Sequence, residues 1–116
     1  MTTSETCIFC RIVAGDIPAT VVAENTHALA FRDLHPQAPV HVLVIPRRHL
    51  DSLDAGRDHV ELLGAVLALA AEVARKEQVA DSGYRVVTNT GADGGQTVGH
   101  LHLHVLGGRS LSWPPG

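Results

Sequence analysis

Three histidines alternate with two leucines near the C-terminal end of the sequence. They are His100, His102 and His104, and Leu101 and Leu103 separate them. Alternate side chains of a β-strand point to the same face, so this spacing predicts three imidazoles on one face and apolar side chains toward a core. Imidazole changes charge near neutral pH and can act as a nucleophile, an acid, a base or a metal ligand. The segment is therefore the candidate active site, with adventitious metal binding by a histidine-rich tract as the simpler alternative.

A glycine-rich turn comes directly before these histidines. It contains Gly94, Gly95, Gln96 and Thr97 in succession. Glycine lets backbone N–H groups approach an anion closely, and the Gln96 amide and the Thr97 hydroxyl add hydrogen-bond donors. Such a turn is a weak signal by itself, but its place beside the imidazoles indicates a phosphate site.

The histidine segment resembles the signature of the histidine triad superfamily, in which three histidines alternate with apolar residues. Three further segments resemble its Hint branch, the histidine triad nucleotide-binding proteins. They are PQAPVHVLVIP at 36–46, NTGADGGQ at 89–96 and WPPG at 113–116. The resemblance extends from Cys7 to Gly116 and implies an α+β fold with a five-stranded antiparallel sheet and two helices. It also implies a symmetric homodimer in which the two sheets join into one.

The resemblance further implies a hydrolase that attacks the α-phosphorus of a nucleotide ester, anhydride or phosphoramidate. By this resemblance His102 is the nucleophile, the carbonyl of His100 fixes its tautomer, and a nucleotidyl-histidine forms. Neutral imidazole is a fair nucleophile and phosphoryl-imidazolium is a good leaving group, so one hard displacement becomes two easier ones. His104 is expected to bond a non-bridging oxygen or to protonate the leaving group. His41 matches a fourth family histidine that acts on His104, although a purely structural histidine is an equal alternative.

Nucleotide contacts are assigned by the same resemblance. Asp33 and Leu34 match the pair that binds the ribose, and Asn89 matches a residue near the ribose and phosphate, with an ordinary turn asparagine as its alternative. The predicted site for AMP, GMP and their phosphoramidates consists of Asp33, Leu34, Asn89, Gly95, Gln96, Thr97, His102 and His104. Phe9, Ile12 and Phe31 either line a base pocket or belong to an ordinary core. We see no acidic pair that would hold magnesium, so no catalytic magnesium is expected.

The two cysteines of the chain, Cys7 and Cys10, form a Cys-x-x-Cys pair. Such a pair is half of a zinc site or, less fittingly here because no strand precedes it, a redox pair. By resemblance to bacterial family members and to related uridylyltransferases, His49 and His100 complete the site. A structural zinc would then tie the N-terminal helix to the sheet, and two free buried cysteines without metal are the alternative.

Periodic patterns predict the elements that position these groups. Apolar residues at helical spacing predict a helix over 7–14, which Gly15 ends. A second helix is predicted over 58–76, with Asp58 as N-cap and Glu61 completing a capping-box pair. Its expected core face is Val60, Leu63, Val66, Leu67, Ala70, Val73 and Ala74. Strands are predicted over 21–24, 27–32, 40–45, 84–88 and 100–106, which together give an α+β fold with an antiparallel sheet.

Length and composition limit the classes of protein. The 116 residues form one predicted domain, 1–116, with residues 1–6 frayed. The resemblance implies that residues 107–116 are a tail that crosses the dimer axis, with a tail folded onto its own chain as the alternative. A net charge of −3 and few aromatic residues argue against nucleic-acid binding. No apolar run reaches transmembrane length and no signal sequence opens the chain, so we expect a cytoplasmic protein without membrane contact.

We interpret the sequence as that of a purine nucleoside phosphoramidate hydrolase that works as a homodimer. A dinucleoside polyphosphate hydrolase of the Fhit type is the alternative within the superfamily. The Trp-Pro-Pro-Gly ending and the Asp93-Gly-Gly-Gln96 turn favour the Hint type. A nucleotide- or zinc-binding interaction protein with negligible turnover is the alternative from another class.

Overall fold

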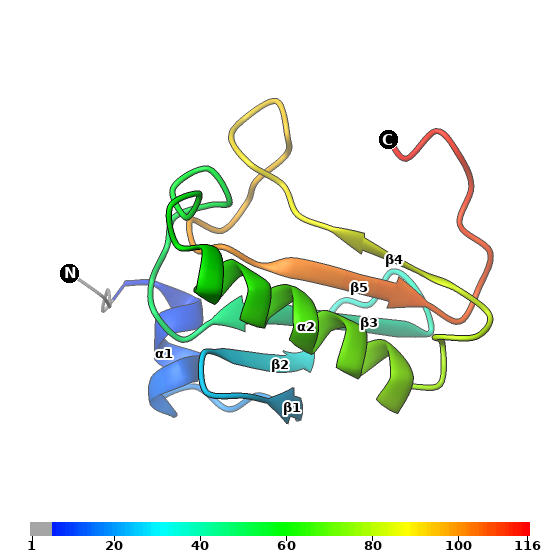
Figure 1. Cartoon of the computed structure of the whole chain (residues 1–116), viewed down its shortest axis with the longest axis horizontal. Coiled ribbons are helices and arrows are strands. Elements are labelled where there is room, and N and C mark those ends of the chain that lie inside the picture. The colour runs from blue at the N-terminus through cyan, green and yellow to red at the C-terminus, as the bar shows by residue number, and fades with distance from the viewer. Residues whose placement is uncertain (1–5) are drawn as a thin grey trace.

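The fold consists of one antiparallel sheet and two helices (Figure 1). A computed structural model describes residues 6–116, so the expected fraying of residues 1–6 falls almost entirely outside the described part of the chain. The helices are α1, Ile8–Ala14, and α2, Val60–Lys76. The strands are β1, Val21–Glu24; β2, Ala28–Arg32; β3, Val40–Pro46; β4, Tyr84–Val87; and β5, Leu103–Gly107. The predicted α+β class and antiparallel sheet are thereby confirmed.

The sheet places the histidine segment between two other strands. Its order is β1-β2-β3-β5-β4, and every neighbouring pair is antiparallel. In β5, His104 lies opposite Leu43 of β3 on one side and Val87 of β4 on the other. A strand in the middle of a sheet has its backbone fixed by hydrogen bonds on both edges, so the position of His104 is set by the whole sheet.

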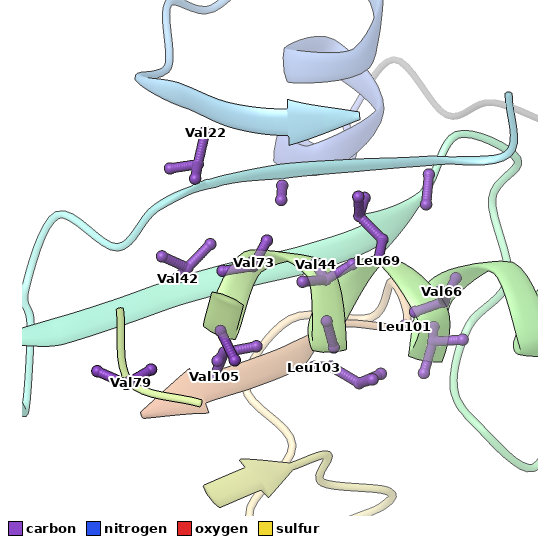
Figure 2. Packing of buried hydrophobic residues seen from close by; sticks show 14 of the residues in the cluster. Val22, Val42, Val44, Val66, Leu69, Val73, Val79, Leu101, Leu103 and Val105 are labelled. Carbon is purple, nitrogen blue, oxygen red and sulfur yellow. The ribbon is translucent and has the colours of Figure 1, made fainter. Parts of the chain in front are cut away.

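Helix α2 covers one face of the sheet and forms the main core with it (Figure 2). Its buried residues are Val66, Leu69, Ala70, Val73 and Ala74. They pack on Val42 and Val44 of β3 and on Leu103 and Val105 of β5 within one cluster. Each valine or leucine removed from water in this way contributes about 1.5–3 kcal/mol to folding.

The predicted core face of α2 was wrong at two positions. Val60 and Leu67 are 75% and 58% exposed, whereas Leu69, which was not predicted, is 1% exposed. At about 100° per residue, Val60 and Leu67 lie about 90–110° from the centre of the buried face. The predicted cap was also wrong, because the helix begins at Val60 after His59, and no side chain caps its first turn.

Helix α1 covers the opposite face of the sheet. Side chains alternate along β3, so Leu43 and Ile45 point away from α2, and they form a second cluster with Phe9 of α1. Cys7 is the N-cap of this helix, and its Sγ accepts a hydrogen bond from the backbone N–H of Cys10 at 3.4 Å. Gly15 ends the helix with φ of 83°, as predicted from the sequence.

The histidine strand begins three residues later than predicted. β5 starts at Leu103, so His100 and His102 precede it. Pro46 of β3 has no N–H to extend the ladder in this direction. The N–H of Leu101 instead donates to the carbonyl of Leu50 at 2.7 Å, outside the sheet. The segment from His100 to His102 is thereby held by the loop that follows β3.

Neither helix in residues 6–116 has the length and apolar run that a membrane crossing needs.

Candidate functional site

All three histidines of the triad lie on the face of the sheet that α1 covers, as the alternation predicted. The ring of Phe9 in α1 contacts those of His100 and His102, with ring centres 5.8 and 5.2 Å apart. On the other face, Leu101, Leu103 and Val105 are buried in the core under α2. His100 and His104 nevertheless belong to two separate groups of polar side chains, and His102 belongs to neither.

His102 has its tautomer fixed by the backbone. Its Nδ1 donates to the carbonyl oxygen of His100 at 2.8 Å, so its Nε2 carries the lone pair. This is the partner that the sequence analysis expected. The structure adds a residue that the sequence analysis missed, because the hydroxyl of Thr88 donates to the carbonyl of His102 at 2.8 Å. The only sequence signal for Thr88 was its place at the end of a predicted strand.

His104 is the end of a chain of hydrogen bonds. The backbone N–H of Gln37 donates to Nδ1 of His41 at 3.0 Å, so Nε2 of His41 carries the proton. That Nε2–H points at Nδ1 of His104, 2.9 Å away, which leaves a donor N–H at Nε2 of His104. Burial, followed by the neighbouring charges of His102 and His41, lowers the pKa of His104 to about 4. Burial also lowers the pKa of His41. Both imidazoles are therefore neutral near pH 7.

A carboxylate and an apolar cavity lie beside this chain. Asp33 accepts from the backbone N–H of His35 at 2.8 Å through one oxygen, and its other oxygen is 3.4 Å from Nε2 of His41. The adjoining cavity has a volume of about 180 Å³. Its lining includes Phe9, Ile12, Phe31, Asp33, Leu34 and Leu43. Phe9 and Phe31 are buried in the second core cluster and also line this cavity, and their part in a base pocket stays a prediction. Leu34 is 89% exposed at its rim.

The glycine-rich turn is closed by its own hydrogen bonds. Gly95 has φ of 78°, and a Cβ on Gly94 would lie 2.4 Å from the carbonyl oxygen of Thr90, so both positions require glycine. The N–H groups of Gly95 and Gln96 donate to the carbonyls of Ala92 and Gly91, both at 3.1 Å. We expected backbone N–H groups of this turn to face an anion. In the structure, these two groups donate to carbonyls within the turn.

The Gln96 amide is likewise engaged inside the protein. Its Nε2 donates to the carbonyls of Asp51 and Val98, and its Oε1 accepts from Gly91. Both N–H groups of the amide are thus committed to carbonyls within the protein, and the expected role of this side chain as a phosphate donor stays a prediction. The hydroxyl of Thr97, an exposed residue, and the half-buried Asn89 after β4 are the remaining polar side chains predicted at this end.

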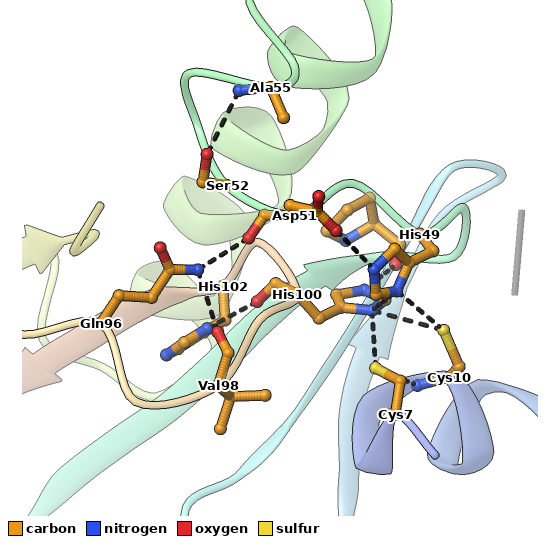
Figure 3. Close-up of polar contacts among 11 residues, drawn as sticks. Cys7, Cys10, His49, Asp51, Ser52, Ala55, Gln96, Val98, His100 and His102 are labelled. Atoms are coloured by element: carbon orange, nitrogen blue, oxygen red, sulfur yellow. Dashed lines mark hydrogen bonds and ion pairs between the residues drawn. The ribbon is translucent and has the colours of Figure 1, made fainter. Parts of the chain in front are cut away.

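The second group of polar side chains is a candidate metal centre. The ligand atoms of Cys7, Cys10, His49 and His100 all lie within 4.8 Å of one another. Nδ1 of His100 is 3.3 and 3.5 Å from the two sulfurs, and Nδ1 of His49 is 3.2 Å from Sγ of Cys10 (Figure 3). Tetrahedral zinc with ordinary bond lengths separates its nitrogen and sulfur ligands by about 3.3–3.7 Å. The donor set and its spacing therefore fit zinc.

Partners behind the two imidazoles point their lone pairs toward the centre of this cluster. Nε2 of His49 donates to a carboxylate oxygen of Asp51 at 2.9 Å, and Nε2 of His100 donates to the carbonyl of Pro46 at 3.0 Å. The two Nδ1 atoms thus carry lone pairs although they are only 3.1 Å apart. Burial lowers the pKa of His100 to about 4, so its imidazole is neutral and available as a ligand. A cation in the centre would relieve the repulsion between the lone pairs.

Comparison with known proteins agrees with this geometry. The model of the HIT domain family matches residues 14–111. An uncharacterised HIT-like protein of Synechococcus elongatus is 53% identical over 114 residues, which cover 97% of this chain and 99% of that protein. The 14 kDa zinc-binding protein of Zea mays is 50% identical over 113 residues, which cover 94% and 87% of the two chains. The crystal structure of a HIT family hydrolase from Legionella pneumophila superposes with a TM-score of 0.91 at 49% identity, covering 96% of this chain and 100% of that one. The chain therefore belongs to the HIT domain family.

Proposed function

We propose that the protein is a purine nucleoside phosphoramidate hydrolase in which His102 is the nucleophile. The observation that supports this assignment best is the hydrogen bond from Nδ1 of His102 to the carbonyl of His100, 2.8 Å long. It leaves the Nε2 lone pair free to attack phosphorus without prior loss of a proton. The neighbouring His104, whose ring centre is 5.1 Å from that of His102, presents an N–H donor beside the same position.

The proposed reaction has two displacements at phosphorus. In the first, Nε2 of His102 forms a bond to the α-phosphorus, the P–N bond breaks, and the leaving nitrogen takes a proton from water to depart as an amine. In the second, water attacks the phosphorus and gives a proton to the hydroxide left by the first step, the bond to His102 breaks, and AMP and the free imidazole are released. Because the pKa of His104 is lowered to about 4, this residue acts as a neutral N–H donor to a non-bridging oxygen, the first of its two expected roles.

The remainder of the nucleotide would lie along the α1 face. The carboxylate of Asp33 would accept from ribose hydroxyls, and the cavity of about 180 Å³ that Phe9 and Phe31 help to line would take a purine ring. Aromatic and aliphatic walls with few polar groups are usual for such pockets. In this arrangement Thr97 and Asn89 contact the phosphate, whereas Gly95 and Gln96 shape the turn that carries Thr97.

We further propose that Cys7, Cys10, His49 and His100 hold a structural zinc ion. When bound, zinc neutralises the two thiolates and fixes the ligand positions, and it takes part in no chemical step. Because α1 supplies two ligands and the segment before β5 supplies one, the metal would tie the helix to the triad. Thiolate ligands stay reduced in the cytoplasm, where we place the protein.

A homodimer is proposed from the unpaired edge of the sheet. β4 is an edge strand, and its Tyr84 and Val86 are 38% and 37% exposed. Leu67 on the outer side of α2 is also exposed, at 58%. A second copy of the chain that pairs along β4 would cover these apolar side chains and would satisfy the free backbone groups of the edge.

The C-terminal tail supports the same arrangement. It extends from β5 away from the body of the molecule (Figure 1), and Trp113 is 79% exposed. The guanidinium of Arg85 holds the middle of the tail by donating to the carbonyl of Ser112 at 2.8 Å. A tail that lay on its own chain would bury Trp113, so we propose that residues 107–116 reach the partner's site and influence leaving-group selectivity. Light scattering at micromolar concentration tests the dimer.

The proposed activity is tested by comparing substrates. Release of AMP from an adenosine phosphoramidate is measured beside hydrolysis of diadenosine polyphosphates under the same conditions. The proposal expects a higher kcat/KM for the phosphoramidate. A preference for the polyphosphates would support the Fhit-type alternative, and negligible turnover of both would support a binding protein.

A further inference from the structure

Gln96 uses every hydrogen-bonding group of its amide apart from one lone pair. Its Nε2 donates to the carbonyl of Asp51 at 2.7 Å and to the carbonyl of Val98 at 3.0 Å. Its Oε1 accepts from the N–H of Gly91 at 3.0 Å. A primary amide has two N–H donors, and both are committed. The side chain therefore joins three separate parts of the backbone and has no donor left for a ligand.

Asp51, the partner of Gln96, belongs to the loop that carries a candidate metal ligand. Its carboxylate accepts from Nε2 of His49 at 2.9 Å, while its carbonyl accepts from Gln96 (Figure 3). One residue thus holds the tautomer of His49 through its side chain and the glycine-rich turn through its backbone. The contact spans 45 positions in the sequence and is the point at which the loop after β3 meets this turn.

We propose that Gln96 is a positioning residue that couples the metal centre to the nucleotide site. A bound metal fixes His49, His49 fixes Asp51, and Gln96 transmits this position to the turn that carries Thr97. Zinc and nucleotide then raise each other's affinity by the same factor, as thermodynamic linkage requires. The inference rests on the proposed nucleotide binding and on the fit of the four ligands to zinc.

A second connection between the metal centre and the nucleotide site runs through His100, and it must be distinguished from the connection through Gln96. His100 is a candidate ligand, and its carbonyl accepts from Nδ1 of His102. That connection acts on the nucleophile and does not pass through Gln96. Variants of Gln96 therefore separate the two routes, because they break only the connection to the turn.

The experiment measures zinc affinity of the full chain by competition with a chromophoric chelator, with and without saturating AMP. Gln96→Glu retains an acceptor for Gly91 but loses both N–H donors, and Gln96→Met removes all three hydrogen bonds without adding charge. Gln78→Glu, at an exposed glutamine after α2, is the matched control for the added charge. Wild type and the control should bind zinc at least about fivefold more tightly with AMP present, within the usual range of coupling.

Both Gln96 variants should reduce this factor to below about twofold. A variant that simply weakened the fold would lower both affinities and leave the factor unchanged. The proposal is overturned if AMP binds the wild type but has no effect on its zinc affinity. It is also overturned if the factor survives in both variants, because the coupling would then run through His100.

Hydrogen exchange tests the connection without any nucleotide. Zinc should slow exchange of the backbone N–H groups of Gly95 and Gln96 in the wild type but not in Gln96→Met. In the zinc-loaded proteins alone, both groups should exchange faster in Gln96→Met than in the wild type, so the test does not depend on a folded metal-free form. Equal exchange in all these forms overturns the proposal. If AMP does not bind but the exchange result is as expected, the proposed function fails while the connection stands.

Discussion

Two clusters of histidine and acidic or sulfur-bearing side chains lie on the same face of the sheet. They differ in whether the imidazole N–H groups donate out of the cluster or into it. In the cluster of Cys7, Cys10, His49 and His100, both imidazoles give their Nε2 protons to groups outside the cluster. Their Nδ1 lone pairs therefore converge, 3.1 Å apart. This arrangement is repulsive when empty and favourable around a cation.

The cluster of Asp33, His41 and His104 has similar spacing but the opposite polarity. The Gln37 N–H occupies Nδ1 of His41 and thereby keeps the proton on Nε2, which points at Nδ1 of His104. A metal on Nε2 of His41 would have to displace that proton. The proton would then lie on Nδ1, where it would face the N–H of Gln37. The cluster therefore acts as a chain of hydrogen bonds that orients His104.

The difference shows that proximity of ligand-type side chains does not identify a metal site. The deciding feature is the group behind each imidazole. A carbonyl or carboxylate there accepts the proton of the outer nitrogen and leaves a lone pair on the inner one, whereas an N–H donor there leaves the proton on the inner nitrogen. His102 lies between the two clusters, with its tautomer set by a candidate metal ligand and its ring beside His104.

The largest effect is expected from removing the residue between the clusters. His102→Ala should lower turnover of an adenosine phosphoramidate by at least about 10³-fold, on the order of 4 kcal/mol of barrier, because the nucleophile is lost. AMP binding and the zinc content should largely persist, since neither cluster loses a member. Mass spectrometry of protein quenched during turnover should locate the AMP adduct on His102 in the wild type. An adduct on His104 or His100 would refute the assignment.

The metal cluster is expected to contribute to stability more than to chemistry. Freshly purified, untagged protein should contain about one zinc per chain by elemental analysis, as four converging ligands imply. Cys7→Ser combined with Cys10→Ser should lower the melting temperature by about 10 °C or more, with a smaller effect on kcat at saturating substrate. A strong chelator should lower the melting temperature of the wild type and not that of the double variant. Zinc content near zero would contradict the assignment and remove the contrast between the two clusters.

The sequence predicted the order of elements and the shared face of the triad, because both follow from periodicity. The Cys-x-x-Cys spacing indicated half of the metal cluster, and the resemblance to the family supplied its two histidines. The errors in the predicted fold arose where tertiary contacts override local patterns. Asp58 has the side chain of an N-cap, but the helix starts after His59. Leu67 fits an amphipathic stripe but lies to one side of the face that α2 buries, and it is exposed.

The polarity of the two clusters could not be predicted from the sequence. It depends on backbone groups such as the Gln37 N–H and the Pro46 carbonyl, whose directions no sequence motif encodes. The partners of Gln96 were unpredictable for the same reason, because one of them is a carbonyl 45 positions away. Side-chain types show which chemistry is available, whereas long-range backbone contacts decide which proton is donated.

A smaller effect is expected from interrupting the hydrogen-bonded cluster. His41→Ala should lower kcat about tenfold, because a lost hydrogen bond of about 1.4 kcal/mol no longer orients His104. His41→Gln places an amide N–H near the former Nε2 and should recover part of this loss. Zinc content should be unchanged in both variants, which separates this cluster from the metal centre. Equal kcat values for the alanine and glutamine variants would show that the donor to His104 has no catalytic importance.

The smallest effect is the dependence of stability on pH that His104 contributes. Its pKa is lowered from 6.5 in the unfolded chain to about 4 in the folded protein, chiefly by burial. Between these values the unfolded chain binds more protons, so the contribution of His104 to stability is complete above about pH 6.5 and is lost as the pH falls toward 4. The full slope for one such group is about 1.4 kcal/mol per pH unit, and the partial exposure of His104 makes this an upper bound. His104→Asn keeps an acceptor for His41 but cannot titrate, so urea unfolding from pH 7 to pH 5 should weaken the wild type more than this variant. Equal losses of stability in the two proteins would show that His104 has an ordinary pKa. The hydrogen-bonded cluster would then not keep this imidazole neutral.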